Sequence, residues 1–499
     1  MGARTGRDYL ERLDAEPREV WIQGERVVTG ITRHPAFRNV TRSIARLYDM
    51  QHEPDLREEM TYVSPTTGER VGMSFLQPRT HEDVARRRRM MKRWADASGG
   101  MLGRTPDYLN SSLMAMAAAA GYFAEADPRF GANIRDYYEY VRENDLCLTH
   151  TLINPQANRA AGPARQRDPY LTARVVKETE RGVVIRGARM LATLGPISDE
   201  IMVFPSTVLK GAPEDAPYAF AFAIPSSTPG LKYICRETFD YGRSRFDHPL
   251  GSRFEEMDAV VVFEDVLVPW ERVFLYQDTQ KCNEVFAATG AVVHMAHQVV
   301  VKNVAKTEFI LGIVCSIIDA IGIEGFQHVQ EKAAEVILAL ESMRAFLRAA
   351  EADAAPDAWG VMTPAWAPLN AARNLYPRLY PRLVEIIQQL SASGLMALPT
   401  EADFQSPVGP VVERYLEARS LNAWERVRLF RLAWDVAASA FGSRQVLYER
   451  FFFGDPVRMA GALFQSYDKR PYVERVRAFL EEAGPAPEEA AAPRASGEA

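Results

Sequence analysis

The sequence contains few cysteines. Only four occur in 499 residues, Cys147, Cys235, Cys282 and Cys315, and none belongs to a CxxC pair. Their spacing matches neither a disulfide framework nor a metal-ligand set. We therefore predict reduced, buried thiols in a cytoplasmic protein, and no metal site.

Long apolar runs and an excess of positive charge are also missing. No run of about 18 apolar residues is present, so no segment is expected to span a membrane. The first residues lack the apolar core of a signal peptide. The formal net charge is -6, which offers no broad basic field to a nucleic acid. The sequence thus predicts a cytoplasmic protein that binds neither membrane nor nucleic acid.

Several well-known catalytic motifs are absent as well. No GxGxxG follows a predicted strand, so the chain has no visible dinucleotide-binding unit of its own. The P-loop pattern GxxxxGK[ST], the zinc motif HExxH and the nucleophile elbow GxSxG are missing too. These absences argue against P-loop phosphoryl transfer, zinc-dependent hydrolysis and serine hydrolysis.

The hydrophobic pattern of the chain changes twice. Up to residue 145 it is mainly helical, whereas residues 148–273 carry short strand-like runs separated by Gly and Pro turns, which favours an antiparallel barrel or sandwich. Long apolar-periodic segments follow and favour a helical bundle, at 284–321, 325–351, 381–393 and 421–450. We predict four regions, with boundaries at 1–145, 146–275, 276–482 and a disordered tail at 483–499.

A helix start at residues 103–108 (GRTPDY) carries a first group of candidate residues. Thr105 is a plausible N-cap, Pro106 suits the first helical position, and Arg104 lies just before the free N–H groups. A guanidinium at such a position makes an anion site, and Tyr108 falls one turn along. The alternative is that Arg104 pairs with a surface carboxylate and Tyr108 packs in the core.

The stretch 145–159, where the helical pattern gives way to strands, carries a second group. His150 lies between two threonines in an alternating pattern typical of a half-buried strand, which opens into a turn at Asn154, Pro155 and Gln156. Thr193 is a hydroxyl in an otherwise apolar run. The alternative for His150 and Thr193 is that they are polar core residues with local hydrogen bonds.

Three stretches resemble the large oxygenase component of the 4-hydroxyphenylacetate 3-monooxygenase family. They are GRTPDY at 103–108, NDLCLTHTLINPQ at 144–156 and GARMLATLGP at 187–196. Shorter similar stretches lie at 6–10, 20–22, 34–39, 228–231 and 448–456. Each motif is short, but their order and spacing extend over nearly the whole chain.

The resemblance implies an α+β architecture of the acyl-CoA dehydrogenase type. It consists of an N-terminal helical domain, a middle antiparallel β-barrel and a C-terminal four-helix bundle, assembled as a homotetramer. The implied activity is that of a two-component, flavin-dependent aromatic monooxygenase. Reduced FAD comes from a separate NAD(P)H-dependent flavin reductase and molecular oxygen is the co-substrate, which agrees with the missing dinucleotide motif.

The implied reaction is ortho-hydroxylation of a 4-hydroxyphenyl compound to a catechol through a flavin C4a-hydroperoxide. Such a reaction needs a phenol held close to its phenolate form and a site shielded from water. By the family pattern Arg104, Tyr108 and His150 hold the phenolic oxygen, with His150 accepting its proton near neutral pH. Thr193 donates to flavin N5 or to the peroxide.

The remaining residues of the family pattern contact other parts of the cofactor. Those expected to position the isoalloxazine ring are Thr151, Asn154, Pro155 and Gln156. Those expected at the adenine and pyrophosphate end, reaching a neighbouring subunit's flavin, are Ser443, Arg444, Gly454 and Asp455. Substrate choice is expected to lie in residues 226–245 and 391–398, where Arg236, Arg243 and Arg245 either hold a carboxylate or are solvated.

The substrate itself is left open. Family members oxidise free phenolic acids, chlorophenols or nitrophenols, or tyrosine-like rings tethered to a carrier protein in natural-product pathways. Two enzymes of related fold are alternatives: an acyl-CoA dehydrogenase-type desaturase, and 4-hydroxybutyryl-CoA dehydratase, whose [4Fe–4S] cluster needs cysteines that the first 146 residues lack. A non-catalytic flavin-binding protein is a further alternative.

Overall fold

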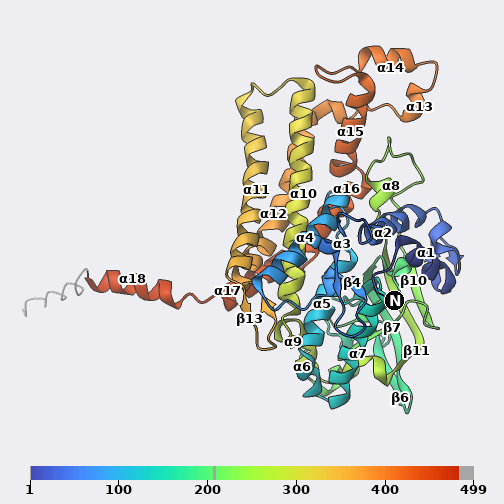
Figure 1. The fold of residues 1–499 in the computed structure, drawn as a ribbon, viewed down its shortest axis with the longest axis vertical. Helices are drawn as coiled ribbons and strands as arrows, with labels where there is room; N and C mark the ends of the chain where they lie inside the picture. The colour runs from blue at the N-terminus through green and yellow to red at the C-terminus, as the bar shows by residue number, and fades with distance from the viewer. Residues whose placement is uncertain (1, 206–208, 483–499) are drawn as a thin grey trace, which may run out of the picture. The chain divides into compact units, whose positions relative to one another are not determined.

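The computed structural model describes residues 2–205 and 209–482. Residues up to Phe452 form one compact unit, and a second unit begins at Phe453. The domain boundaries predicted at 145 and 275 lie within the first unit and stay predictions. Figure 1 shows that this unit combines a group of long helices with β-sheets.

The first part of the chain is mainly helical, as predicted. Its helices are α1(Gly6–Ala15), α2(Arg38–Met50), α3(Arg57–Met60), α4(His81–Ala97), α5(Pro106–Ala118), α6(Ala120–Ala124) and α7(Pro128–Asn144). Thr5 and Thr80 begin α1 and α4 with capping boxes that use Asp8 and Asp83. Helix α5 begins at Pro106, as its sequence predicts, although the Thr105 side chain makes no capping hydrogen bond.

The strands form two open sheets and not the closed barrel expected from the resemblance. One has the order β2-β1-β10-β11-β7-β6 and the other β12-β9-β8-β5. The strands of the larger sheet are β1(Glu19–Ile22), β2(Glu25–Val27), β6(Arg174–Thr179), β7(Gly182–Thr193), β10(Leu231–Cys235) and β11(Asp258–Pro269). Those of the smaller sheet are β5(Leu148–Thr151), β8(Glu200–Val203), β9(Phe220–Pro225) and β12(Val273–Tyr276).

The prediction of purely antiparallel strands was also wrong. β1 pairs with β10 and β5 pairs with β8 in parallel. The physical reason is the connection: the chain leaves β5, forms the β6–β7 hairpin of the other sheet and returns to β8 in the same direction. The buried rings of Phe222 and Phe263 lie 6.2 Å apart and join the two sheets. Short two-stranded sheets pair β3(Thr61–Val63) with β4(Arg70–Gly72) and β13(Ala355–Pro356) with β14(Met362–Thr363).

The predicted long helices are present, with three differences. The helices that overlap the predicted segments are α9(Thr279–Ala288), α10(Ala291–Ile321), α11(Gln327–Ala352), α12(Trp366–Ser391), α15(Ala423–Ala437) and α16(Ala440–Phe451). Short helices that were not predicted are α8(Gly251–Phe254), α13(Glu401–Phe404) and α14(Gly409–Tyr415). The predicted segment 284–321 is divided at Gly290, where α9 has ended and α10 begins. Helix α12 begins well before the predicted 381 and continues through Pro377 and Pro381, because packing against α10 and α11 outweighs the local cost of proline. The predicted helix 421–450 is interrupted at Ala438, and Ser439 caps the second half.

The second unit contains α17(Pro456–Ser466) and α18(Arg470–Glu482). Asp455 caps α17 by accepting hydrogen bonds from the backbone N–H groups of Val457 and Arg458, at 2.9 and 3.0 Å. The predicted disordered tail lies outside the described residues. Within the described part of the chain, no helix is long and apolar enough to cross a membrane.

A buried carboxylate joins the bundle to the segment before β11. Asp435 of α15 is fully buried and accepts hydrogen bonds from the backbone N–H groups of Leu250 and Gly251, at 2.7 and 2.8 Å. We expect Asp435→Ala to lower the free energy of unfolding by about 2 kcal/mol, because it leaves two buried donors without acceptors. Urea unfolding measures this, with the exposed Asp319→Ala as the matched control. Equal stability of the two variants would contradict the role of Asp435.

Candidate functional site

Arg104 lies among aromatic rings, and no described carboxylate forms an ion pair with its guanidinium. Its Cζ atom lies 4.2 Å from the centre of the Phe452 ring and 4.4 Å from that of Tyr108. Its Nε and Nη1 atoms are buried and have no hydrogen-bond partner among the described residues. Only its backbone N–H meets an acid, donating to Glu256 Oε1 at 2.6 Å. This cation therefore has free donors and no neutralising side-chain partner.

Tyr108 and His150 complete the cluster that the sequence predicted. Tyr108 lies on α5 one turn beyond Arg104, and its ring centre is 5.8 Å from that of His150 on β5. Both side chains are buried, at 4% and 7% exposure. The structure thus brings Arg104, Tyr108 and His150 together, although Tyr108 and His150 are 42 positions apart in the sequence.

The side chains of Thr149 and Thr151 lie on the face of β5 opposite to that of His150. Thr149 donates to the backbone oxygen of Thr193, and Thr151 to that of Met190, at 2.7 and 2.8 Å. Because side chains alternate on a strand, these bonds hold β5 against β7 while His150 faces Tyr108. Thr151 is fully buried, and its predicted contact with the isoalloxazine ring stays a prediction.

His150 is a neutral imidazole in this environment. Burial, and then the charge of Arg104, lower its pKa well below the ordinary value of 6.5. It has no hydrogen-bond partner within the described part of the chain. A neutral ring nitrogen of this kind accepts a hydrogen bond from a hydroxyl, but burial weakens it as a base relative to free histidine.

The predicted turn after β5 meets a buried arginine. Asn154 Oδ1 accepts a hydrogen bond from Arg189 of β7, and Gln156 donates to the backbone oxygen of Asn154 at 3.1 Å. Pro155 is half-buried and Gln156 exposed. Burial lowers the pKa of Arg189 to about 10, and its Nε and Nη2 atoms have no partner among the described residues. Sequence reasoning did not single out Arg189.

Thr193 and Arg444 meet at a shared carboxylate. The Thr193 hydroxyl donates to Asp258 Oδ1 at 2.7 Å. Arg444 of α16 binds both oxygens of Asp258, at 2.9 and 3.0 Å, and donates to Glu256 Oε2 at 2.7 Å. Burial by itself would raise the pKa of Asp258, but Arg444 and Arg236 outweigh it and hold that pKa far below its usual range.

The other predicted residues make different contacts. Ser443 is exposed on α16. Gly454 and Asp455 belong to the second unit, where Asp455 caps α17. Arg236 binds Glu255 and Asp258, at 2.5 and 3.2 Å, so its guanidinium is already paired. The flavin-binding roles of Ser443, Arg444, Gly454 and Asp455 stay predictions.

Two family models match the chain. The model described as "4-hydroxyphenylacetate 3-hydroxylase N terminal" covers residues 5–275, and the one described as "4-hydroxyphenylacetate 3-hydroxylase C terminal" covers residues 282–481. The chain belongs to the 4-hydroxyphenylacetate 3-hydroxylase family. The resemblance stated from short motifs is thereby confirmed.

Named relatives and a crystal structure of one such protein support this membership. A 4-hydroxyphenylacetate 3-monooxygenase oxygenase component from Geobacillus sp. is 56% identical, over 96% of this chain and 97% of that protein. The Thermus thermophilus protein of the same name is 54% identical, over 96% of this chain and 98% of that one. A crystal structure of an oxygenase component complexed with FAD and 4-hydroxyphenylacetate has a TM-score of 0.92 and 54% identity, and covers 96% and 99% of the two chains.

The fold is shared more widely than the family. An archaeal 4-hydroxybutyryl-CoA dehydratase from N. maritimus superposes with a TM-score of 0.86 at 20% identity, over 98% of this chain and 96% of that one. This likeness concerns the fold alone. Among the described residues of the present chain, no three His, Cys, Asp or Glu side chains gather as a metal site.

Family membership directs attention to residues that local sequence did not reveal. Tyr448 and Phe452 lie one helical turn apart near the end of α16. The Phe452 ring centre is 5.4 Å from that of Tyr108, and the Tyr448 ring centre is 5.7 Å from Arg104 Cζ. The charge of Arg373 on α12 acts on Tyr108. The stretch 448–456 was among the motifs that resemble the family, but a sequence motif does not predict which distant residues the rings of Tyr448 and Phe452 contact.

A buried charge cluster lies beneath Tyr448. Lys302 and Lys306 of α10 both donate to Glu449 Oε1 at 2.5 Å, and the Lys302 Nζ atom lies 5.3 Å from the Tyr448 ring centre. Burial lowers the pKa of Lys302 to about 8. Two ammonium groups thus share one buried carboxylate here.

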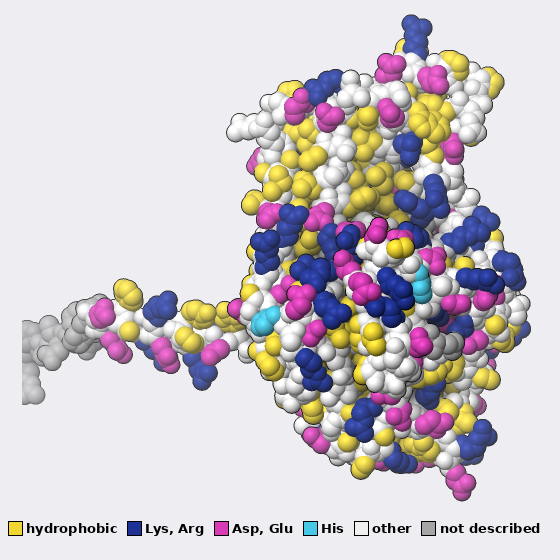
Figure 2. Space-filling view, viewed as in Figure 1, with side chains coloured by type: hydrophobic (Ala, Val, Ile, Leu, Met, Phe, Trp, Pro, Cys, Tyr) yellow, Lys and Arg dark blue, Asp and Glu magenta, His cyan; other side chains and the backbone are white. Residues whose placement is uncertain are grey.

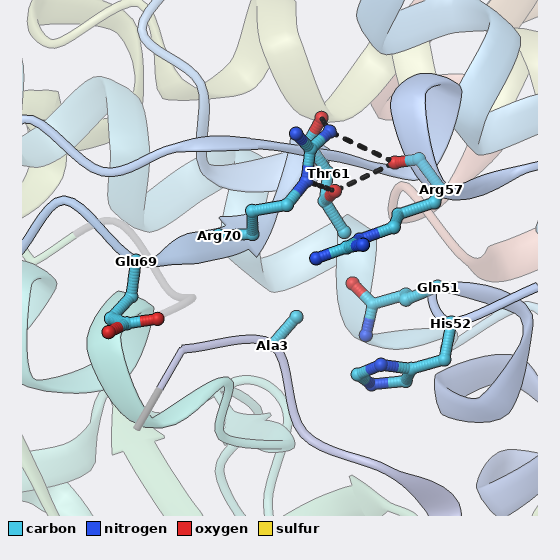
Figure 3. Close-up of a pocket in the computed structure, with 7 residues that line it drawn as sticks. All are labelled: Ala3, Gln51, His52, Arg57, Thr61, Glu69 and Arg70. Carbon is cyan, nitrogen blue, oxygen red and sulfur yellow. Dashed lines mark hydrogen bonds between the residues drawn. The ribbon is translucent and has the colours of Figure 1, made fainter. Parts of the chain in front are cut away.

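Two surface cavities share no lining residue with the Arg104 cluster. One, of about 160 Å³, is lined by Gln51, His52, Arg57, Thr61 and Arg70 among others, and Figure 3 shows Arg70 and Thr61 directed toward the backbone oxygen of Arg57. The other, of about 280 Å³, is bordered by charged residues of α4, α10 and α11. Charged side chains line both cavities, so neither provides the dry surroundings that the family reaction needs.

Proposed function

We propose that this chain is the oxygenase component of a two-component monooxygenase. It uses reduced FAD from a separate NAD(P)H-dependent flavin reductase, and molecular oxygen, to ortho-hydroxylate a 4-hydroxyphenyl acid to a catechol. The observation that carries the proposal is the Arg104 guanidinium, which has buried, unpartnered donors beside a neutral His150 and the Tyr108 ring. The close relatives named for 4-hydroxyphenylacetate favour a free phenolic acid as substrate.

The phenolic oxygen is the group that this cluster suits. The Arg104 charge favours the phenolate, which raises electron density on the ring carbon ortho to it. His150 accepts the hydrogen bond or proton of the hydroxyl, because its imidazole is neutral. Tyr108 and Phe452 pack on the cation and exclude water, which strengthens its interaction with the anion.

The residues present also fit a flavin. Reduced FAD, when bound, supplies the activated oxygen that is transferred to the ring. The unpartnered Nε and Nη2 atoms of buried Arg189 offer donors to an anionic or carbonyl group of the cofactor. They lie beside the turn of Asn154, Pro155 and Gln156, which together with Thr151 and Thr193 is assigned to the isoalloxazine ring in this proposal. Ser443, Arg444, Gly454 and Asp455 are assigned to the adenine and pyrophosphate end.

The assembly is part of the same proposal. Apolar side chains gather over the upper part of the helical bundle (Figure 2). Exposed large apolar side chains of the helical region include Leu338 of α11 and Val411 and Tyr415 of α14, at 67%, 52% and 69%. Patches of this kind are typical of surfaces that bind another subunit. We assign them to contacts within a homotetramer that works in the cytoplasm, and sedimentation of the purified protein measures the oligomeric state.

The function is tested by a product screen. Purified protein, a generic flavin reductase, FAD and NADH are combined with 4-hydroxyphenylacetate, chlorophenols, nitrophenols and a carrier-tethered tyrosine. We expect the catechol of the free phenolic acid, together with less peroxide than the reductase alone produces. Peroxide without hydroxylated product from every phenol would overturn the proposal, and product from the tethered ring alone would replace its substrate class.

A further inference from the structure

The hydrogen-bonding direction of Thr193 is fixed by its surroundings. The Thr193 hydroxyl has one proton to donate, and Asp258 Oδ1 lies 2.7 Å away. An ionised carboxylate only accepts, so the proton must lie on the Thr193–Asp258 axis. The lone pairs of the hydroxyl oxygen are what remain available to any other group at this end of β7.

The hydrogen bonds of Asp258 keep its carboxylate in place as the acceptor of the Thr193 proton. Its Oδ1 accepts from Thr193 and Arg444, and its Oδ2 accepts from Arg444 and Arg236, at 2.7 to 3.2 Å. The roughly four acceptor positions of the carboxylate are therefore all in use. Two guanidinium groups keep the carboxylate charged, and it starts β11 directly opposite Thr193 in the strand register.

The same arginine also reaches the substrate side of the site. Arg444 donates to Glu256 Oε2, while Glu256 Oε1 accepts the backbone N–H of Arg104. One guanidinium of the bundle thus connects the Thr193 hydroxyl to the segment that carries Arg104. Arg444 and Asp258 act through other residues, which makes them positioning residues.

From this geometry we propose that Asp258, clamped by Arg444 and Arg236, turns Thr193 into an obligatory hydrogen-bond acceptor that selects reduced over oxidised flavin. The inference rests on the proposed function, which assigns Thr193 to flavin N5. Reduced flavin carries an N–H at that position, whereas oxidised flavin presents a bare lone pair. A fixed acceptor forms a hydrogen bond with the first and opposes the second, and it reverses the donor role expected for Thr193 from the resemblance.

The measurement is the ratio of the dissociation constants for oxidised and reduced FAD. Calorimetric titration gives both, the second under nitrogen with FAD reduced by dithionite. We expect the wild-type protein to bind reduced FAD at least 10-fold more tightly, because one state makes a hydrogen bond and the other leaves two acceptors facing each other.

Two variants should lower the ratio of the dissociation constants, one by changing the constant for oxidised FAD and the other by changing the constant for reduced FAD. In Asp258→Asn the amide turns its oxygen to Arg444 and its NH₂ group to Thr193, which frees the Thr193 proton, so oxidised FAD should bind about 10-fold more tightly. In Thr193→Val the acceptor is gone, so reduced FAD should bind about 10-fold more weakly. Thr193→Ser keeps the hydroxyl and should keep the wild-type ratio.

Controls separate this role from a structural one. A merely structural residue changes both dissociation constants by the same factor, as expected for the buried Thr289→Val, whose hydroxyl bonds within α9. If Asp258→Asn does not fold, Thr193→Val decides. An unchanged ratio in Thr193→Val overturns the inference, whereas loss of hydroxylation by the wild-type protein with every phenol overturns the proposed function instead.

Discussion

Arg104→Gln is expected to lower kcat/KM for 4-hydroxyphenylacetate by roughly 100- to 1,000-fold. Glutamine keeps a polar side chain but removes the charge that lies 4.4 Å from the centre of the Tyr108 ring and 4.2 Å from that of Phe452. The phenol then loses the cation that favours its ionised form in this proposal. Steady-state catechol formation with excess reduced FAD measures the loss.

The matched control is Arg89→Gln. Arg89 lies on α4, is 40% exposed and pairs with Glu82 at the surface, so its replacement should leave kcat/KM unchanged. Peroxide release by Arg104→Gln should meanwhile rise toward the total flavin oxidised. A decrease of less than threefold in Arg104→Gln would contradict the assignment of the phenolic oxygen to Arg104.

His150→Gln is expected to lower the rate of hydroxylation by about 100-fold, because the amide accepts a hydrogen bond but takes up no proton. The pH dependence follows from the pKa of His150, which burial and Arg104 lower well below 6.5. The wild-type imidazole stays neutral as pH falls from about 8 to about 6, so its protonation should not reduce the rate there.

Below that range the imidazolium forms and the acceptor is lost, so the loss of activity that is caused by His150 should occur only at pH well under 6.5. The measurement is kcat/KM against pH for the wild-type protein and for His150→Gln, after confirming that both stay folded. A wild-type rate that halves at pH 6.5, with no such step in His150→Gln, would show that His150 titrates normally and would contradict the lowered pKa.

Local pattern was sufficient for much of the fold. The alternation around His150 predicted a half-buried strand, and the strand is present as β5, although all four of its residues are buried. Thr105-Pro106 predicted where α5 begins. The sheets were harder, because β1 lies in the part of the chain predicted to be mainly helical and pairs with β10, some 200 residues away. A hydrophobic pattern indicates that a strand exists, but strand pairing depends on partners that are remote in sequence.

In the candidate site, too, residues within short motifs were predicted, whereas residues that depend on distant partners were not. Arg104, Tyr108 and His150 belong to short motifs and were found together as expected. Asp258 and Glu256 were missed, since an acidic residue before a strand is ordinary until Arg444 is placed against it. Arg189 was inside a recognised motif, yet only its burial without a carboxylate distinguishes it from a surface arginine.

The central claim is that the Arg104 cluster stabilises the anion of a bound phenol, and the pKa of the bound phenol tests it most directly. 4-Hydroxyphenylacetate is titrated by ultraviolet difference absorbance in an anaerobic complex with the protein and reduced FAD. We predict a pKa about 2 units below the value near 10 of a free phenol, because a cation in a dry site favours the charged form. A bound pKa that stays near 10, and is the same in Arg104→Gln, would contradict the account.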